Sequence, residues 1–205
     1  MPVSAIDTVI FDMDDVLCNY DCEARLDHMA RSIGLEREAI IKAIWTSGFD
    51  EAADKGAYTA DEYLVETQRR LGVAITRGEW VAARRAGTMA RSEVLEIAGC
   101  VAERATIACL TNNGPLMREH INEIFPEAHE LFGEQLFFSC DLPAAKPDPK
   151  AFRTLVTRLG SEPKRTLFID DDEGYVLGAA SAGLHVHCYT DAETLAHQLR
   201  NFALI

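Results

Sequence analysis

Two aspartates stand two positions apart at the end of a short apolar run near the start of the chain. The run covers residues 6–11, and Asp12 and Asp14 follow it. Residues i and i+2 of an extended segment point to the same side, so we expect the two carboxylates to lie close together. Crowded carboxylates repel one another unless a cation or a proton separates them. Taken alone, the pair fits an acidic turn equally well.

A second acidic cluster follows another apolar run, residues 166–169. It consists of Asp170, Asp171 and Asp172. Neither cluster contains His or Cys, which argues against zinc. Carboxylate oxygens at this density suit Mg²⁺, which binds one or two carboxylates together with a substrate phosphate. The two clusters therefore predict Mg²⁺ as the cofactor.

Two other segments have residues that suit an anion. Thr111 follows the apolar run 106–110, and Asn112 comes just before a helix predicted to begin near Pro115. A hydroxyl and free backbone N–H groups at the start of a helix bind anions. Lys146 lies just before two stiffening prolines, Pro147 and Pro149, ahead of a second predicted helix, where an ammonium can hold a phosphate oxygen. Each segment also fits an ordinary loop, the lysine then being only a solubilising charge.

Apolar runs and helical stretches alternate over most of the chain. Besides the runs already named, residues 136–138 and 184–189 read as strands. This alternation predicts an α/β fold, with a Rossmann-like parallel sheet and helical crossovers. The carboxyl ends of parallel strands share one edge, where ligands bind. Asp12, Thr111 and Asp171 are therefore expected to meet there.

A stretch without a convincing strand interrupts this alternation between about residues 20 and 88. Two capping boxes mark helix starts in it, one from Thr59 to Glu62 and one from Thr76 to Glu79. We predict a helical bundle over residues 19–88, inserted into an α/β part made of residues 1–18 and 89–205.

Composition excludes several classes of function. The chain has 205 residues, with 20 basic and 33 acidic side chains and a net charge of −13. This charge argues against nucleic acid or an anionic membrane as the main partner. Residues 1–11 lack the basic start of a secretory signal, and the six cysteines form no CxxC pair. With no apolar run of about 18 residues, these features predict a cytoplasmic protein with reduced thiols. Nothing in the pattern predicts an oligomeric state.

The order of these motifs resembles that of the haloacid dehalogenase-like hydrolase superfamily. The resemblance covers essentially the whole chain and is weakest in the helical insert, which corresponds to the cap of such proteins. It implies that residues 19–88 are the cap and that residues 1–18 and 89–205 are the catalytic core. The glycine-flanked segment of the cap with Lys55 and Tyr58 is our candidate for the loop that recognises the substrate. The resemblance favours the phosphatase branch, because the second aspartate, Asp14, is typically absent from dehalogenases, whose halide leaving group needs no proton. The matching stretches are FDMDDVL at residues 11–17, LTNN at 110–113, KPDP at 146–149 and FIDDD at 168–172.

The resemblance implies a role for each matching residue. Asp12 is expected to be the nucleophile and to form an aspartyl-phosphate. Asp14 is expected to be the general acid for the leaving group and then the base for water. The phosphoryl group is expected to bind to Thr111, Asn112 and Lys146. Mg²⁺ is expected to bind to Asp12, Asp171 and the backbone carbonyl of Asp14, and Asp170 is expected to support the metal.

The implied function is Mg²⁺-dependent hydrolysis of a small phosphorylated metabolite. Three alternatives stay open: a phosphomutase, a 2-haloacid dehalogenase and a non-catalytic module that binds a phosphorylated ligand. The sequence departs from the family pattern at Asp15, where relatives often have Gly. It departs again at Tyr175, where relatives often have an acidic or amide residue.

Overall fold

A five-stranded parallel sheet forms the centre of the protein. The computed structural model describes residues 6–205, so residues 1–5 of the predicted core lie outside the described residues. The strand order is β5-β4-β1-β6-β7, which confirms the predicted α/β fold. The strands are β1 (Thr8–Phe11), β4 (Thr106–Thr111), β5 (Leu136–Phe138), β6 (Thr166–Asp170) and β7 (His185–Cys188).

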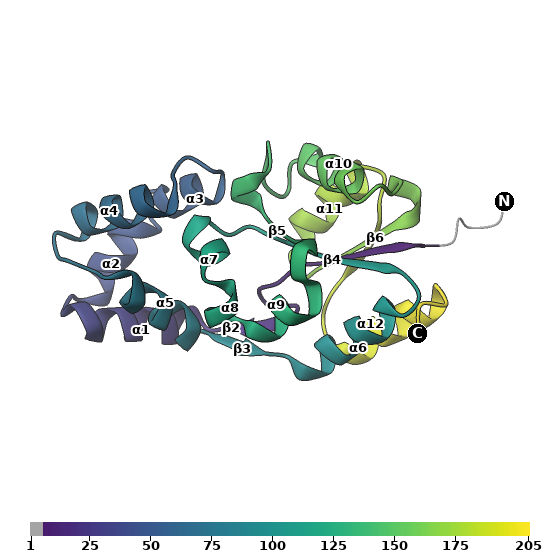
Figure 1. Ribbon diagram of the computed structural model, residues 1–205, viewed down its shortest axis with the longest axis horizontal. Coiled ribbons are helices and arrows are strands. Elements are labelled where there is room, and N and C mark those ends of the chain that lie inside the picture. The colour runs from purple at the N-terminus through teal and green to yellow at the C-terminus, as the bar shows by residue number, and fades with distance from the viewer. Residues whose placement is uncertain (1–5) are drawn as a thin grey trace.

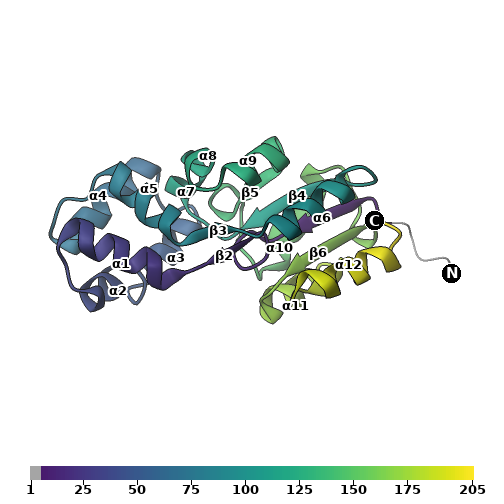
Figure 2. The same ribbon diagram turned by 90° about the horizontal axis from the view of Figure 1, so that it is seen from below.

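Helices cover both faces of the sheet because its central strands are apolar on both sides (Figures 1 and 2). Ile10 of β1 packs in one hydrophobic cluster with α10 (Pro149–Arg158) and α11 (Glu173–Ser181). Val9 and Phe11, on the opposite face, belong to a second cluster. The core helices of that second cluster include α6 (Ser92–Ala102), α9 (Pro126–Phe132) and α12 (Ala192–Asn201).

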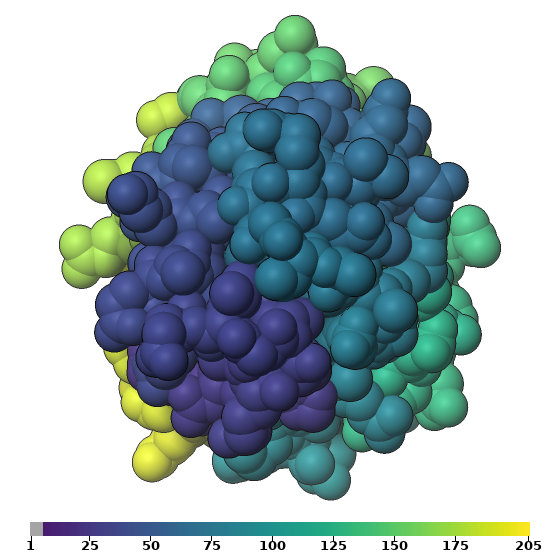
Figure 3. Space-filling model, turned by 90° about the vertical axis from the view of Figure 1, so that its left-hand side faces the viewer, coloured from purple at the N-terminus to yellow at the C-terminus, as the bar shows by residue number. Residues whose placement is uncertain are grey.

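The predicted cap consists mainly of five helices at one end of the molecule, on the left in Figure 1. Figure 3, which looks onto that end, shows these helices covering it. Both predicted capping boxes are present, at Thr59 and at Thr76. The helices are α1 (Cys22–Ile33), α2 (Arg37–Ile44), α3 (Phe49–Asp54), α4 (Ala60–Leu71) and α5 (Arg77–Ala86).

The two connections between core and cap pair with each other. They form an antiparallel ribbon of β2 (Cys18–Tyr20) and β3 (Thr88–Ala90), which the sequence analysis missed. The Asp21 N–H extends the ribbon by donating to the Gly87 carbonyl at 2.8 Å. Strands of three residues are too short to show a period-two pattern, so only the fold reveals them. The exact cap boundaries at residues 19 and 88 stay a prediction.

The remaining elements are short. The helix predicted to begin near Pro115 is divided at His120 into α7 (Pro115–Glu119) and α8 (Ile121–Ile124). The 3₁₀ turns are η1 (Gly133–Gln135), η2 (Ser139–Asp141) and η3 (Pro163–Arg165).

All six cysteines are free. No helix within residues 6–205 is long and apolar enough to cross a membrane.

Candidate active site

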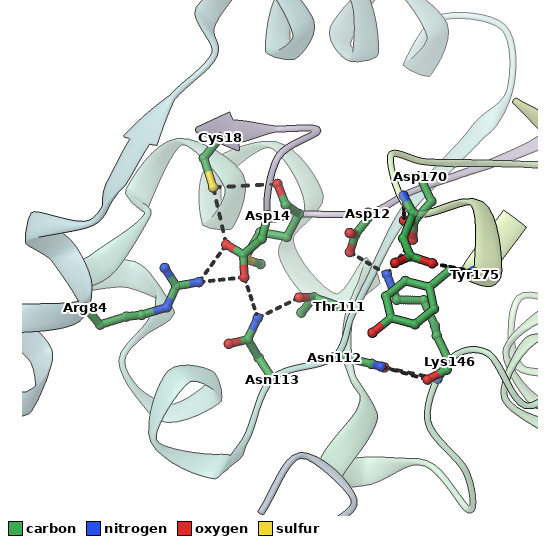
Figure 4. Close-up of polar contacts among 12 residues, drawn as sticks. Asp12, Asp14, Cys18, Arg84, Thr111, Asn112, Asn113, Lys146, Asp170 and Tyr175 are labelled. Carbon is green, nitrogen blue, oxygen red and sulfur yellow. Dashed lines mark hydrogen bonds and ion pairs between the residues drawn. The ribbon is translucent and has the colours of Figure 1, made fainter. Parts of the chain in front are cut away.

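Asp12 and Lys146 form a buried ion pair at the carboxyl edge of the sheet (Figure 4). Asp12 follows β1, and its Oδ1 lies 2.6 Å from Lys146 Nζ. The same ammonium lies 2.6 Å from Oδ2 of Asp170 at the end of β6. Burial raises the pKa of Asp12, whereas the Lys146 ammonium acts in the opposite direction. Burial likewise opposes the charge on Lys146, but the two carboxylates hold its pKa above the ordinary value.

Three carboxylates at this edge are close enough to share a cation. One oxygen each from Asp12, Asp170 and Asp171 lies within 4.8 Å of the others. Asp170 has both oxygens engaged, because Oδ1 accepts from the Asp172 N–H at 2.9 Å while Oδ2 faces Lys146. Asp171 lies at the surface of the protein. Partial loss of solvent around its carboxyl group and the neighbouring Asp170 carboxylate both raise its pKa. The set contains only oxygen donors, as the sequence analysis expected.

Asp14 turns away from this trio and pairs with the cap. Its two oxygens lie 2.6 and 2.8 Å from Nη2 of Arg84, a residue of α5 (Figure 4). The amide of Asn113 donates to Asp14 Oδ2 at 3.1 Å. Burial alone would raise the pKa of Asp14, yet the Arg84 guanidinium and these hydrogen bonds hold it below the ordinary value.

The loop after β4 links the phosphate-binding candidates. Thr111 is buried at the strand end, and its Oγ1 accepts a hydrogen bond from the Asn113 amide at 2.7 Å. The Asn112 amide donates to the Lys146 carbonyl at 2.8 Å and accepts from the Lys146 N–H at 3.0 Å. The Asn112 side chain therefore fixes the backbone of the lysine, a contact that its predicted phosphate role did not include.

Comparison with known proteins identifies the family. A family model described as "haloacid dehalogenase-like hydrolase" matches residues 6–183. The chain belongs to this family. A phosphatase of Mycobacterium tuberculosis is 27% identical over 201 residues, covering 89% of this chain and 87% of the relative.

Solved structures agree in fold. A family enzyme from Bacteroides thetaiotaomicron, in complex with magnesium and inorganic phosphate, superposes with a TM-score of 0.79 at 22% identity. The match covers 93% of this chain and 98% of the other. The L-2-haloacid dehalogenase of Xanthobacter autotrophicus has a TM-score of 0.62 at 19% identity, covering 98% of this chain and 84% of its own.

In this hydrolase, Lys146 is held in place by packing as well as by charge. Its ammonium lies 4.7 Å from the ring centre of Tyr175, so the face of this ring also stabilises the cation. Gly178 of α11 packs directly under the lysine loop. A Cβ at that glycine would lie 2.1 Å from the Pro147 carbonyl oxygen, so only glycine lets the helix approach this closely.

The large cavity of the hydrolase, about 860 Å³, lies beside Lys146 and Tyr175. Lys55, which follows α3, lines it, although its ammonium also pairs with Glu51 of that helix. Tyr58 is not in the cavity lining. Its ring packs edge-on against Phe49 with ring centres 5.3 Å apart. The structure therefore brings only Lys55, of the two predicted substrate-recognising residues, to the cavity beside the catalytic edge.

The sequence analysis assigned no role to Arg84 or Asn113. Arg84 is 1% exposed and also donates to the Thr88 hydroxyl at 2.7 Å. A signal for it does exist, because it lies four positions after Trp80 on the apolar face of α5. An arginine on such a face needs a buried partner. The partner itself, 70 residues away, is visible only in the fold.

Proposed function

We propose that the protein is a Mg²⁺-dependent phosphatase that hydrolyses a small phosphorylated metabolite through an aspartyl-phosphate on Asp12. One observation carries the proposal: Asp12 stands beside a buried lysine and two further carboxylates, while a separate carboxylate, Asp14, lies two residues along the same loop. Phosphoryl transfer needs this combination of a nucleophile, charge neutralisation and an acid–base group.

The residues present fit Mg²⁺. The oxygens of Asp12, Asp170 and Asp171 lie close enough to meet at one ion, and no softer ligand is among them. When bound, the ion would neutralise negative charge on the phosphoryl oxygens. Asp12 and Asp171 are the ligands we propose, together with the Asp14 carbonyl. Asp170 then supports the site chiefly by holding Lys146.

In the first proposed step, an Asp12 oxygen attacks phosphorus and the bond from phosphorus to the leaving oxygen breaks. Lys146 and Thr111 hold the phosphoryl oxygens, with help from the backbone of Asn112. Asp14 gives its proton to the leaving oxygen, which departs as an alcohol. In the arrangement described, Arg84 keeps Asp14 ionised. The contact between the two side chains must therefore loosen before Asp14 can take up the proton that it donates.

In the second step, Asp14 accepts a proton from water as the water oxygen attacks phosphorus. The bond between phosphorus and the Asp12 oxygen breaks, which releases inorganic phosphate and restores both side chains. The Arg84 contact suits this step, since it favours the base form of Asp14. The cap over residues 19–88 would close above the site and exclude other water.

The presence of Asp14 separates this proposal from the dehalogenase alternative. A halide leaves without a proton, whereas an alkoxide needs one. Release of chloride from 2-chloropropionate, without release of phosphate from any ester, would therefore favour the dehalogenase.

The experiment is phosphate release from p-nitrophenyl phosphate by the wild type and by Asp12→Asn, each with Mg²⁺ and with excess chelator. We expect turnover only in the wild type with Mg²⁺, because an amide is a poor nucleophile of nearly the same size. Identical purification of Asp12→Asn controls for contaminating phosphatases, and its melting temperature shows whether it folds. Turnover by a folded Asp12→Asn protein would contradict the nucleophile assignment.

A further inference from the structure

A second, much smaller pocket lies between the cap and the loop after β4. Its volume is about 20 Å³, just above the roughly 10–15 Å³ that one water molecule needs. Polar side chains of the cap form one wall, and the start of α7 forms the other. Its lining includes Arg25, Asp50, Asp54 and Trp80 of the cap, and Asn113 and Gly114 of the core.

Two buried N–H donors in this pocket meet no acceptor at normal hydrogen-bond geometry among residues 6–205. Arg25 is 5% exposed, and its guanidinium lies 5.3 Å from the ring centres of both Trp45 and Trp80. Its Nη1 donates to the Tyr20 hydroxyl at 2.8 Å. The Nε–H of Arg25 and the indole N–H of Trp80, which is 4% exposed, form no hydrogen bond of normal geometry with residues 6–205. A buried donor without an acceptor is unfavourable, so the pocket suits a ligand that accepts hydrogen bonds.

The pocket also offers acceptors. Asp50 accepts from the Tyr63 hydroxyl at 2.6 Å and has further lone pairs. The Asp54 carboxyl lies over Gly114, where an added Cβ would come within 3.3 Å of its Oδ1. Two acidic residues thus face the single arginine, Arg25, and the pocket has no surplus of positive charge with which to attract an anion.

This pocket adjoins the reacting centre. The Asn113 amide that lines it donates to both Asp14 and Thr111. Asp54 lines this pocket and also the large cavity that contains Lys146. A leaving group on a phosphorus held at Asp12 would therefore pass the acid–base residue and reach Asp54.

We propose that this pocket binds one hydroxyl group of the leaving group, and that the substrate is the monophosphate of a small uncharged polyol. The inference rests on the proposed phosphatase function. A hydroxyl can accept from Arg25 and Trp80 and donate to an oxygen of Asp54, whereas an ionised carboxylate cannot donate and would bring a further negative charge beside Asp50. The narrow pocket also disfavours a large aromatic leaving group.

The activity test compares three-carbon phosphates that differ only in the features in question: glycerol 1-phosphate, propyl phosphate and 3-phosphoglycerate. We expect kcat/KM for glycerol 1-phosphate to exceed the other two by at least about tenfold, because propyl phosphate leaves buried polar groups unpaired. Trp80→Phe should lower the ratio of kcat/KM for glycerol 1-phosphate to kcat/KM for propyl phosphate. The matched control is Trp45→Phe, which changes the other ring beside Arg25 and should keep the preference. Equal losses on all substrates, or a preference for 3-phosphoglycerate, would overturn the proposal.

A binding test does not depend on turnover. The chain has two tryptophans, so its indole N–H spectrum is assigned by Trp80→Phe and Trp45→Phe. In Asp12→Asn protein, glycerol 1-phosphate should shift the Trp80 resonance, and inorganic phosphate should not. If the Trp80 resonance does not shift, the proposal that this pocket binds the leaving group is wrong. If the Trp80 resonance shifts but the wild type does not hydrolyse p-nitrophenyl phosphate, the phosphatase proposal fails and the polyol pocket is supported.

Discussion

Arg84 of the cap forms a two-oxygen ion pair with Asp14 of the core, at 2.6 and 2.8 Å from one guanidinium nitrogen. The arginine lies 4.2 Å from the ring centre of Tyr20, which belongs to the ribbon joining the two parts. The proposed acid–base residue is therefore attached to the element that would move as the cap opens. Through this contact, the position of the cap determines whether Asp14 is free to exchange a proton.

Arg84→Met is expected to lower the free energy of unfolding strongly, since it leaves Asp14 without its cation. Breaking a buried pair costs about 3–5 kcal/mol, and we expect the lower end because the Asp14 side chain is 25% exposed. Urea unfolding at neutral pH measures the loss. The control is Arg85→Met, an exposed neighbour on the same helix. Similar losses in both variants would contradict a specific role for the pair.

Asp14→Asn is expected to separate leaving-group protonation from the rest of catalysis. Asparagine keeps the size of the side chain and can still face Arg84, whereas alanine would leave that arginine unpaired. We expect kcat to fall by roughly 10²–10⁴ for alkyl phosphates and by much less for p-nitrophenyl phosphate, whose leaving group needs little protonation. Equal losses for the two classes would rule out Asp14 as the acid.

Local pattern was sufficient to predict the five strands of the central sheet and the edge at which the candidate residues meet. Runs such as residues 166–169 are apolar because both faces of the sheet are covered, and the change to aspartate marks the strand end. The predicted convergence of Asp12 and Asp171 follows from parallel topology alone.

Contacts between distant segments could not be predicted in this way. The Arg84–Asp14 pair depends on how α5 sits over the core, and Asn112 and Lys146 meet across 34 residues. Sequence spacing suggested that Lys55 and Tyr58 act together. Tyr58 instead packs on Phe49, because an aromatic side chain beside an apolar cluster gains more from burial than from facing a cavity.

Gly178→Ala is expected to impair catalysis and stability together. The new methyl group would collide with the Pro147 carbonyl, so either α11 or the loop bearing Lys146 must move. We expect kcat/KM for p-nitrophenyl phosphate to fall at least about tenfold, because displacement by 1 Å in a catalytic group can cost as much as 100-fold. The control is Gly99→Ala in α6, where nothing lies within 4 Å of the new Cβ. That change should be neutral or stabilising by about 0.5–1 kcal/mol. Unchanged kinetics in Gly178→Ala would show that this packing does not position Lys146.

Asp54 is expected to make stability depend on pH. Burial and the nearby Asp50 raise its pKa from 3.8 to about 8. Between these values the folded state binds more protons than the unfolded state, so the free energy of unfolding falls as pH rises from about 4 to 8. Asp54→Asn removes this contribution and should flatten the fall, which urea unfolding at pH 5, 6, 7 and 8 measures. Glu51→Gln is the matched control, because its hydrogen bond to Lys55 lowers the pKa of Glu51 and its removal cannot flatten the fall. If the pH profile of Asp54→Asn is parallel to that of the wild type, Asp54 has the same pKa in the folded and unfolded states. The pocket between cap and core would then be open to water.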